Sequence, residues 1–188
     1  ENYGKERVIW RYDPIILSQK YDLSCHMDQF ERLADRLFLY TDTCVFSFVD
    51  IYDKIKSNLA AAEYMSITSV QKENFARCFS VIASYRQIKL KTCAEDIELD
   101  QFGIDHSCCI DSDLIERITG YKLSVKKENT QKSQCHCVEN VDVGQYNTCK
   151  HMCKCYYANY IIASVKNSYA RHDPKSPCLL EILRQMIR

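Results

Sequence analysis

The chain has 188 residues, and its 25 Lys and Arg residues balance its 25 Asp and Glu residues, so the net charge at pH 7 is zero. This neutrality excludes a strongly basic nucleic-acid binder and an acidic tail protein. With 46% hydrophobic residues but only 4 Gly and 3 Pro, the chain has enough apolar material for a core and too few chain breakers for a linker. We therefore expect one globular domain, or a large part of one.

The start of the chain carries no sign of a leader. Its first ten residues, ENYGKERVIW, hold four charges and no apolar segment of the signal-peptide kind. No apolar stretch is long enough to cross a bilayer, so we expect no membrane partner and a cytoplasmic location, where cysteines are free thiols or metal ligands. Because the chain begins at Glu1 without Met, we expect an N-terminally incomplete protein.

The first part of the chain alternates between strand and helix patterns. Residues 7–12 (RVIWRY) predict a short buried strand that ends at Asp13-Pro14, since Pro interrupts a strand. Apolar residues at three- and four-residue steps predict an amphipathic helix over 22–40, with Asp22 or Ser24 as N-cap. Residues 43–49 (TCVFSFV) then predict a second strand.

A second helix and a third strand follow. The helix is expected from about Thr68, whose hydroxyl and Gln71 have the spacing of a capping box. The third strand is predicted over residues 88–95 (IKLKTCAE), and a short helix over 113–119 ends at Gly120.

Three strands separated by helices predict consecutive right-handed βα units with a parallel sheet. A closed barrel takes eight such units over roughly 250 residues, so we expect an α/β fold in the form of a partial TIM-like barrel. We divide the chain into this barrel (1–120), a cysteine-rich cluster-binding segment (121–178) and an amphipathic C-terminal docking helix (179–188).

The strand exits come first among the candidate sites, because the carboxyl ends of parallel strands carry the chemistry of such folds. The polar residues expected there are Arg11, Asp13, Asp50, Cys93 and Glu95. Arg binds carboxylates or phosphates, and a carboxylate accepts protons or ribose hydroxyls, so Arg11, Asp13 and Glu95 are candidate cofactor-binding residues. The alternative is a structural ion pair of Arg11 with Asp13 or Glu95.

Closely spaced cysteines form the most specific pattern. The 12 Cys include Cys135-x-Cys137 and, eleven residues later, Cys149-x3-Cys153-x-Cys155. Neighbouring thiolates converge readily on one soft metal ion or cluster, so all five are candidate metal ligands. The spacing leaves structural zinc and an iron–sulfur cluster equally open.

The other cysteines carry a weaker signal. Cys93, with Cys108 or Cys109 and the pair at 135 and 137, could form a second metal site. The alternative is that Cys93 is a buried small hydrophobe and that the adjacent pair is partly exposed. Three earlier cysteines are expected in the core, and two histidines between the thiols are expected in solvent: Cys25, Cys44, Cys78, His136 and His151.

A basic stretch weakly supports a nucleic-acid partner. Residues 121–154 hold six Lys against three acids, next to Tyr156, Tyr157 and Tyr160, a combination that could contact phosphates and stack on bases. A solvated loop beside an apolar cluster explains the same residues.

Several blocks of the chain resemble one known family. These are GKERVIWRYDPIIL, TCAEDIEL, CCIDSDLIERI, GYKLSVKKENTQKSQCHCVENVDVGQYNTCKHMCKCYYANY and ARHDPKSP, which lie in order between about Gly4 and Cys178. Together they resemble the bacterial family called domain of unknown function 1848, whose members are sometimes labelled as similar to spore photolyase or DNA-repair photolyase.

The resemblance implies a radical-SAM-like protein with its three-cysteine motif near the C-terminus. Such a motif holds a 4Fe–4S cluster that binds S-adenosylmethionine and, with a reductant such as ferredoxin or flavodoxin, releases a 5′-deoxyadenosyl radical. The implied first and second ligands are Cys149 and Cys153. The substrate is unknown.

The third ligand departs from the family pattern, in which an aromatic residue precedes the last Cys. Here Cys155 and Tyr156 stand in the opposite order, which shortens the spacing by one residue. Either the loop accommodates Cys155, or Cys135 or Cys137 supplies the third thiolate, or this chain has lost the cluster. The alternative function is a non-catalytic zinc- or iron–sulfur-binding structural module.

Overall fold

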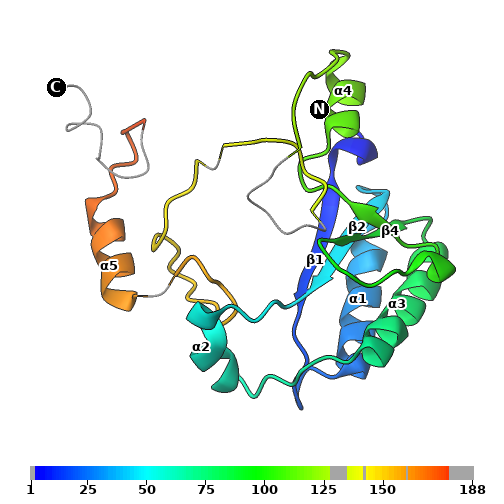
Figure 1. Ribbon diagram of the computed structural model, residues 1–188, viewed down its shortest axis with the longest axis horizontal. Coiled ribbons are helices and arrows are strands. Elements are labelled where there is room, and N and C mark those ends of the chain that lie inside the picture. The colour runs from blue at the N-terminus through cyan, green and yellow to red at the C-terminus, as the bar shows by residue number, and fades with distance from the viewer. Residues whose placement is uncertain (1–2, 128–134, 142, 160, 178–188) are drawn as a thin grey trace. The chain divides into compact units, whose positions relative to one another are not determined.

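Four parallel strands form one sheet in the computed structural model of the chain, which describes residues 3–127, 135–141, 143–159 and 161–177 (Figure 1). Their order in the sheet is their order in the sequence: β1 (Ile9–Ile15), β2 (Thr43–Phe48), β3 (Lys89–Cys93) and β4 (Asp105–Ser107). The prediction of consecutive parallel βα units is confirmed. The sheet is open, with β1 and β4 at its edges, and the partial barrel stays a prediction.

Two helices connect the first three strands and pack on the same face of the sheet (Figure 1). They are α1 (Leu23–Leu37) and α3 (Ser69–Ser84). The side chain of Asp22 caps α1 by accepting from the amide of Cys25 at 2.8 Å. Thr68 and Gln71 form the complete capping box of α3. Both predicted helix starts are therefore confirmed.

An aromatic core lies between this face of the sheet and the two helices. The rings of Phe30 in α1 and Phe79 in α3 stack with their centroids 4.0 Å apart, and both side chains are fully buried. Trp10, Phe46 and Leu90 from the first three strands pack in the same cluster. Because side chains alternate along a strand, the intervening residues point to the face that α1 and α3 leave open.

The predicted end of the first strand is wrong. β1 runs through Asp13 and Pro14 to Ile15, beyond the predicted end at residue 12. β1 is an edge strand, and its register with β2 shifts between Tyr12 and Ile15. At such an irregular edge position the N–H that proline lacks is not needed for the ladder.

Beyond the sheet, helix α4 (Ser112–Thr119) follows β4 and ends at Gly120 in the left-handed conformation, with φ of 77°. The sequence predicts this helix to within one residue. Short 3-10 turns occur at Lys5–Arg7, Asp53–Ile55 and Asp100–Phe102.

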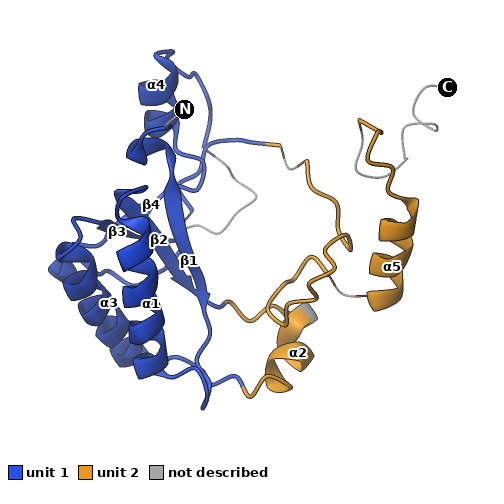
Figure 2. Cartoon of the chain, turned by 180° about the vertical axis from the view of Figure 1, so that it is seen from behind, with its two compact units in different colours: residues 1–49, 64–140 blue, residues 50–63, 141–188 orange. Residues whose placement is uncertain are grey.

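The chain divides into two compact units (Figure 2). The first comprises residues 1–49 and 64–140 and contains the sheet, and the second comprises residues 50–63 and 141–188. The second unit contains α2 (Lys56–Ala60) and α5 (Ile162–Arg171), neither of which is predicted from the sequence pattern. The expected helix over 179–188 lies outside the described residues. Within the described ranges, no helix combines the length and apolar character needed to cross a membrane.

Candidate functional site

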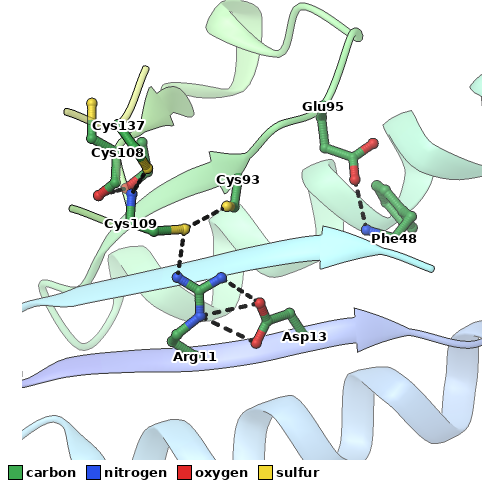
Figure 3. Close-up of polar contacts among 9 residues, drawn as sticks. Arg11, Asp13, Phe48, Cys93, Glu95, Cys108, Cys109 and Cys137 are labelled. Carbon is green, nitrogen blue, oxygen red and sulfur yellow. Dashed lines mark hydrogen bonds and ion pairs between the residues drawn. The ribbon is translucent and has the colours of Figure 1, made fainter. Parts of the chain in front are cut away.

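Two thiols meet at the carboxyl ends of β3 and β4. Cys93 is the last residue of β3, and Cys109 lies two residues beyond the end of β4. Their Sγ atoms are 2.8 Å apart (Figure 3), and neither residue is in a disulfide. The alternative that Cys93 is a buried small hydrophobe is therefore wrong, because its thiol is half-buried and hydrogen-bonded.

Arg11 reaches this thiol pair from β1. It lies in register with Val45 of β2, which lies in register with Lys91 of β3, so all three side chains belong to the open face of the sheet. The Nη1 atom of Arg11 donates to the Sγ atom of Cys109 at 3.2 Å (Figure 3). Its Nη2 atom forms an ion pair with Asp13 at 2.5 Å. The structural alternative of an Arg11–Asp13 pair is thus confirmed.

The hydrogen bonds of the pair set its ionisation. The hydrogen bond from Cys109 and the contacts with Arg11 together lower the pKa of Cys93 to about 7, against the opposing effect of burial. The same hydrogen bond, together with burial, raises the pKa of Cys109. The pair therefore loses its first proton at a pH of about 7 and keeps the second proton above that pH.

The guanidinium of Arg11 keeps its positive charge over the pH range in which the two thiols ionise. Burial opposes its charge most strongly, but hydrogen bonds to Asp13 and Cys93 and the nearby negative charges together raise its pKa above the ordinary value. Since Asp13 already balances this charge, the guanidinium can stabilise a thiolate without an excess of positive charge.

Glu95 lies apart from Arg11 and joins two strand ends. Its Oε1 atom accepts from the amide of Phe48 at 2.8 Å, and its Oε2 atom pairs with Lys72 of α3 at 2.8 Å (Figure 3 shows the first contact). The side chain is only 7% exposed. A cofactor-binding role for Arg11, Asp13 or Glu95 stays a prediction.

A later segment brings two further cysteines to the pair. The Sγ atom of Cys137 accepts from the amides of Cys109 at 3.1 Å and Ile110 at 3.4 Å (Figure 3 shows the first residue pair). Cys135 interacts with Cys137 by a side-chain hydrogen bond, and both are buried. The cysteines of the expected second metal site thus all lie in the first unit, and the site itself stays a prediction. Within the described parts of the chain, no three His, Cys, Asp or Glu side chains are arranged to hold a metal ion.

The three tail cysteines lie in the second unit, in a loop that closes on itself. The amide of Asn147 donates to the carbonyl of Ala158 at 2.8 Å, and the side chain of Asn159 donates to the carbonyl of Cys149. Cys149 and Cys155 are half-buried, whereas Cys153 is exposed. Burial raises the pKa of Cys155, and the proximity of Cys153 adds to the effect.

A cavity of about 390 Å³ opens on the free face of the sheet. Its lining includes Arg11 and Cys109 as well as charged residues of both signs, among them Lys91, Asp105, Asp111 and Arg117. Cys109 therefore borders a space that is large enough for a small polar ligand.

The remaining predicted residues have simple environments. Cys44 is fully buried in the core, while Cys25 and Cys78 are half-buried. As expected, His136 and His151 are exposed. Asp50 is exposed and belongs to the second unit. Cys178 and Tyr160 lie outside the described residues.

Comparison with known proteins gives one match. The model of a family described as "Domain of unknown function (DUF1848)" matches residues 1–158. No curated protein and no solved structure matches the chain.

Proposed function

Because the chain belongs to the DUF1848 family, we propose that it is an iron–sulfur-binding, radical-SAM-like protein with Cys149, Cys153 and Cys155 as its cluster ligands. One observation carries this proposal: three cysteines outside disulfides lie within seven residues of a loop whose ends are joined by a hydrogen bond. Thiolates are the usual protein ligands of a 4Fe–4S cluster.

The chemistry of the loop fits such a group. Its donors are thiols, and Cys153 is open to solvent. Binding requires their deprotonation, which the raised pKa of Cys155 opposes until a cation replaces the proton. The thiols do not surround a common centre as they stand, so the loop must rearrange locally to bind.

The side chain of Asn159 is a second feature of the loop that fits a bound cofactor. This residue is only 6% exposed, and its Oδ1 atom has no hydrogen-bond donor among the described residues. An unsatisfied buried oxygen costs about 1–3 kcal/mol, so a ligand donor at this place would be stabilising. The Asn159 oxygen would be available to accept from a donor group of a cofactor held by this loop.

When bound, the cluster would supply an electron, delivered by a ferredoxin or flavodoxin, for reductive cleavage of S-adenosylmethionine. The residues of the chain would hold the bound groups and orient them. Within the sheet unit, the guanidinium of Arg11 would bind a carboxylate, with Asp13 fixing its orientation. Glu95 would keep the end of β2 beside the segment that follows β3, through its contacts with Phe48 and Lys72. We place this activity in the cytoplasm.

A non-catalytic module is the second candidate. The segment around the thiols consists of irregular chain and turns rather than helices or strands, and a structural zinc ion or cluster would stabilise such a segment. In that case the thiols bind metal, but the protein does not respond to S-adenosylmethionine.

Anaerobic reconstitution of the full chain separates these functions. We expect iron and acid-labile sulfide in equal amounts, the absorption of a 4Fe–4S cluster, and a change in the spectrum of the reduced cluster on addition of S-adenosylmethionine. Stoichiometric zinc without that absorption would exclude the radical function. A cluster whose spectrum ignores S-adenosylmethionine would leave only a structural or electron-transfer role.

A pair of variants tests the third ligand. Cys155→Ser removes a proposed ligand and is expected to abolish the cluster. The double variant Cys155→Tyr/Tyr156→Cys restores the order found in the family and is expected to keep it. A cluster that survives in Cys155→Ser would assign the third position to another cysteine.

A further inference from the structure

The thiols of Cys93 and Cys109 are arranged for chemistry that the proposed cluster does not use. They lie in the first unit, whereas the three proposed ligands lie in the second. Their sulfurs are 2.8 Å apart, a contact that brings two side chains from different strand ends together (Figure 3). No backbone rearrangement is needed to bring these sulfurs within reach of each other.

Neighbouring groups hold the two thiols in place. The guanidinium of Arg11 donates to Cys109, and Asp13 anchors that guanidinium. The amide of Cys109 donates to the sulfur of Cys137, which fixes the backbone on the other side. Since the contacts come from both sides, the pair is preorganised for reaction.

The exposure of Cys109 and the charges that line the cavity indicate which kind of small molecule would reach the thiol pair. Cys109 is exposed and borders the cavity of about 390 Å³ on the open face of the sheet. Lys91 and Arg117 in the lining would attract carboxylates, and Asp105 and Asp111 would attract amino groups. This mixture suits a small zwitterionic molecule.

We propose that Cys93 and Cys109 form a reactive dithiol that exchanges with small zwitterionic disulfides. The thiolate of the pair attacks one sulfur of the disulfide, breaks its S–S bond and releases the first small thiol. The second cysteine loses its proton and attacks the mixed disulfide, which releases the second small thiol. Two electrons pass from the protein to the small disulfide, and the Cys93–Cys109 bond forms.

The geometry of the pair supports this assignment, because the two sulfurs are already in contact and Arg11 donates to one of them. Neither Cys93 nor Cys109 is among the three proposed cluster ligands, so the loss of the cluster and the loss of the dithiol can be measured separately.

The experiment uses the reduced full chain and glutathione disulfide as the probe. After anaerobic incubation at neutral pH, the free thiols are alkylated and the peptides are identified by mass spectrometry. We expect a Cys93–Cys109 disulfide and two equivalents of glutathione released for each disulfide formed. Cys78→Ser, which removes a half-buried cysteine of α3, is expected to behave like the parent chain.

Single variants trap the intermediate. In Cys109→Ser or Cys93→Ser the exchange stops at the mixed disulfide, so one glutathione remains attached to the other cysteine of the pair. The proposal is overturned if both thiols of the parent chain stay free in excess glutathione disulfide. It is also overturned if stoichiometric zinc in the isolated protein protects both thiols, which would assign them to a metal site.

Discussion

At the scale of single residues, Arg11 connects the structural and the chemical interpretations of the sequence. The sequence offers it either as a partner of a nearby carboxylate or as a cofactor contact. The structure shows the carboxylate partner, Asp13, and adds a contact with the thiol of Cys109. This contact depends on the path of the chain after β4, so the local pattern around Arg11 does not reveal it.

The contact predicts the pH dependence of alkylation at Cys93. Iodoacetamide reacts with the thiolate, whose fraction rises as the pH rises through the pKa, so the rate at Cys93 should be half-maximal at a pH of about 7. Cys109 acts on it through a hydrogen bond, and Arg11 and Cys137 act on it through their charges. Quantitative mass spectrometry of each cysteine after timed alkylation measures this profile.

Two variants and one internal reference accompany that profile. Arg11→Gln removes a hydrogen bond and a positive charge, so the midpoint should rise by about one pH unit, whereas the exposed Lys56→Gln should not move it. Burial raises the pKa of Cys44, which should therefore stay unmodified in the folded protein. A parent-chain midpoint at the value of an ordinary thiol would contradict the described contacts.

Lys72 gives a prediction about stability. Lys72→Met leaves the buried carboxylate of Glu95 without its cation, and should lower the free energy of unfolding by about 1–3 kcal/mol. The matched control is Lys56→Met, because the Lys56–Asp53 pair is 63% and 91% exposed and should contribute nothing measurable. Urea unfolding monitored by circular dichroism compares the two, and equal effects would rule out a structural role for the Glu95 contact.

At the scale of elements, helices and strands with clear local signals are predictable, and elements without such signals are not. α1 and α3 carry both an apolar period and an N-cap, and their starts are confirmed. β4 consists of three residues, DHS, that have no apolar run, and α5 buries only Val165 among its described side chains. Such elements form because the surrounding chain positions them, so the sequence pattern does not identify them.

The capping box of α3 makes this argument quantitative. Thr68→Ala removes the side-chain acceptor for the amide of Gln71 and should lower the free energy of unfolding by about 1 kcal/mol. Thr68→Ser keeps the acceptor and should stay close to the parent chain. Urea unfolding curves provide the measurement, and equal losses in both variants would show that the methyl group, rather than the cap, is responsible.

At the scale of the whole molecule, the chain carries two sets of cysteines in two units. The sheet unit gathers Cys93, Cys109, Cys135 and Cys137 from three parts of the sequence. The other unit holds the tail thiols within one loop. Sequence spacing identifies the second set because its members are neighbours in the chain. It groups Cys93 with Cys108 or Cys109 only as a possible second metal site and does not reveal the thiol contact, because that contact requires β3 and β4 to lie side by side.

The iron content of three reconstituted proteins tests the central claim most directly. These are the parent chain, the triple variant Cys149→Ser/Cys153→Ser/Cys155→Ser, and the double variant Cys93→Ser/Cys109→Ser as the matched control. We predict equal iron and sulfide in the parent chain and the double variant, and none in the triple variant. A triple variant that still binds the full amount of iron and sulfide would contradict the assignment of the cluster to this loop.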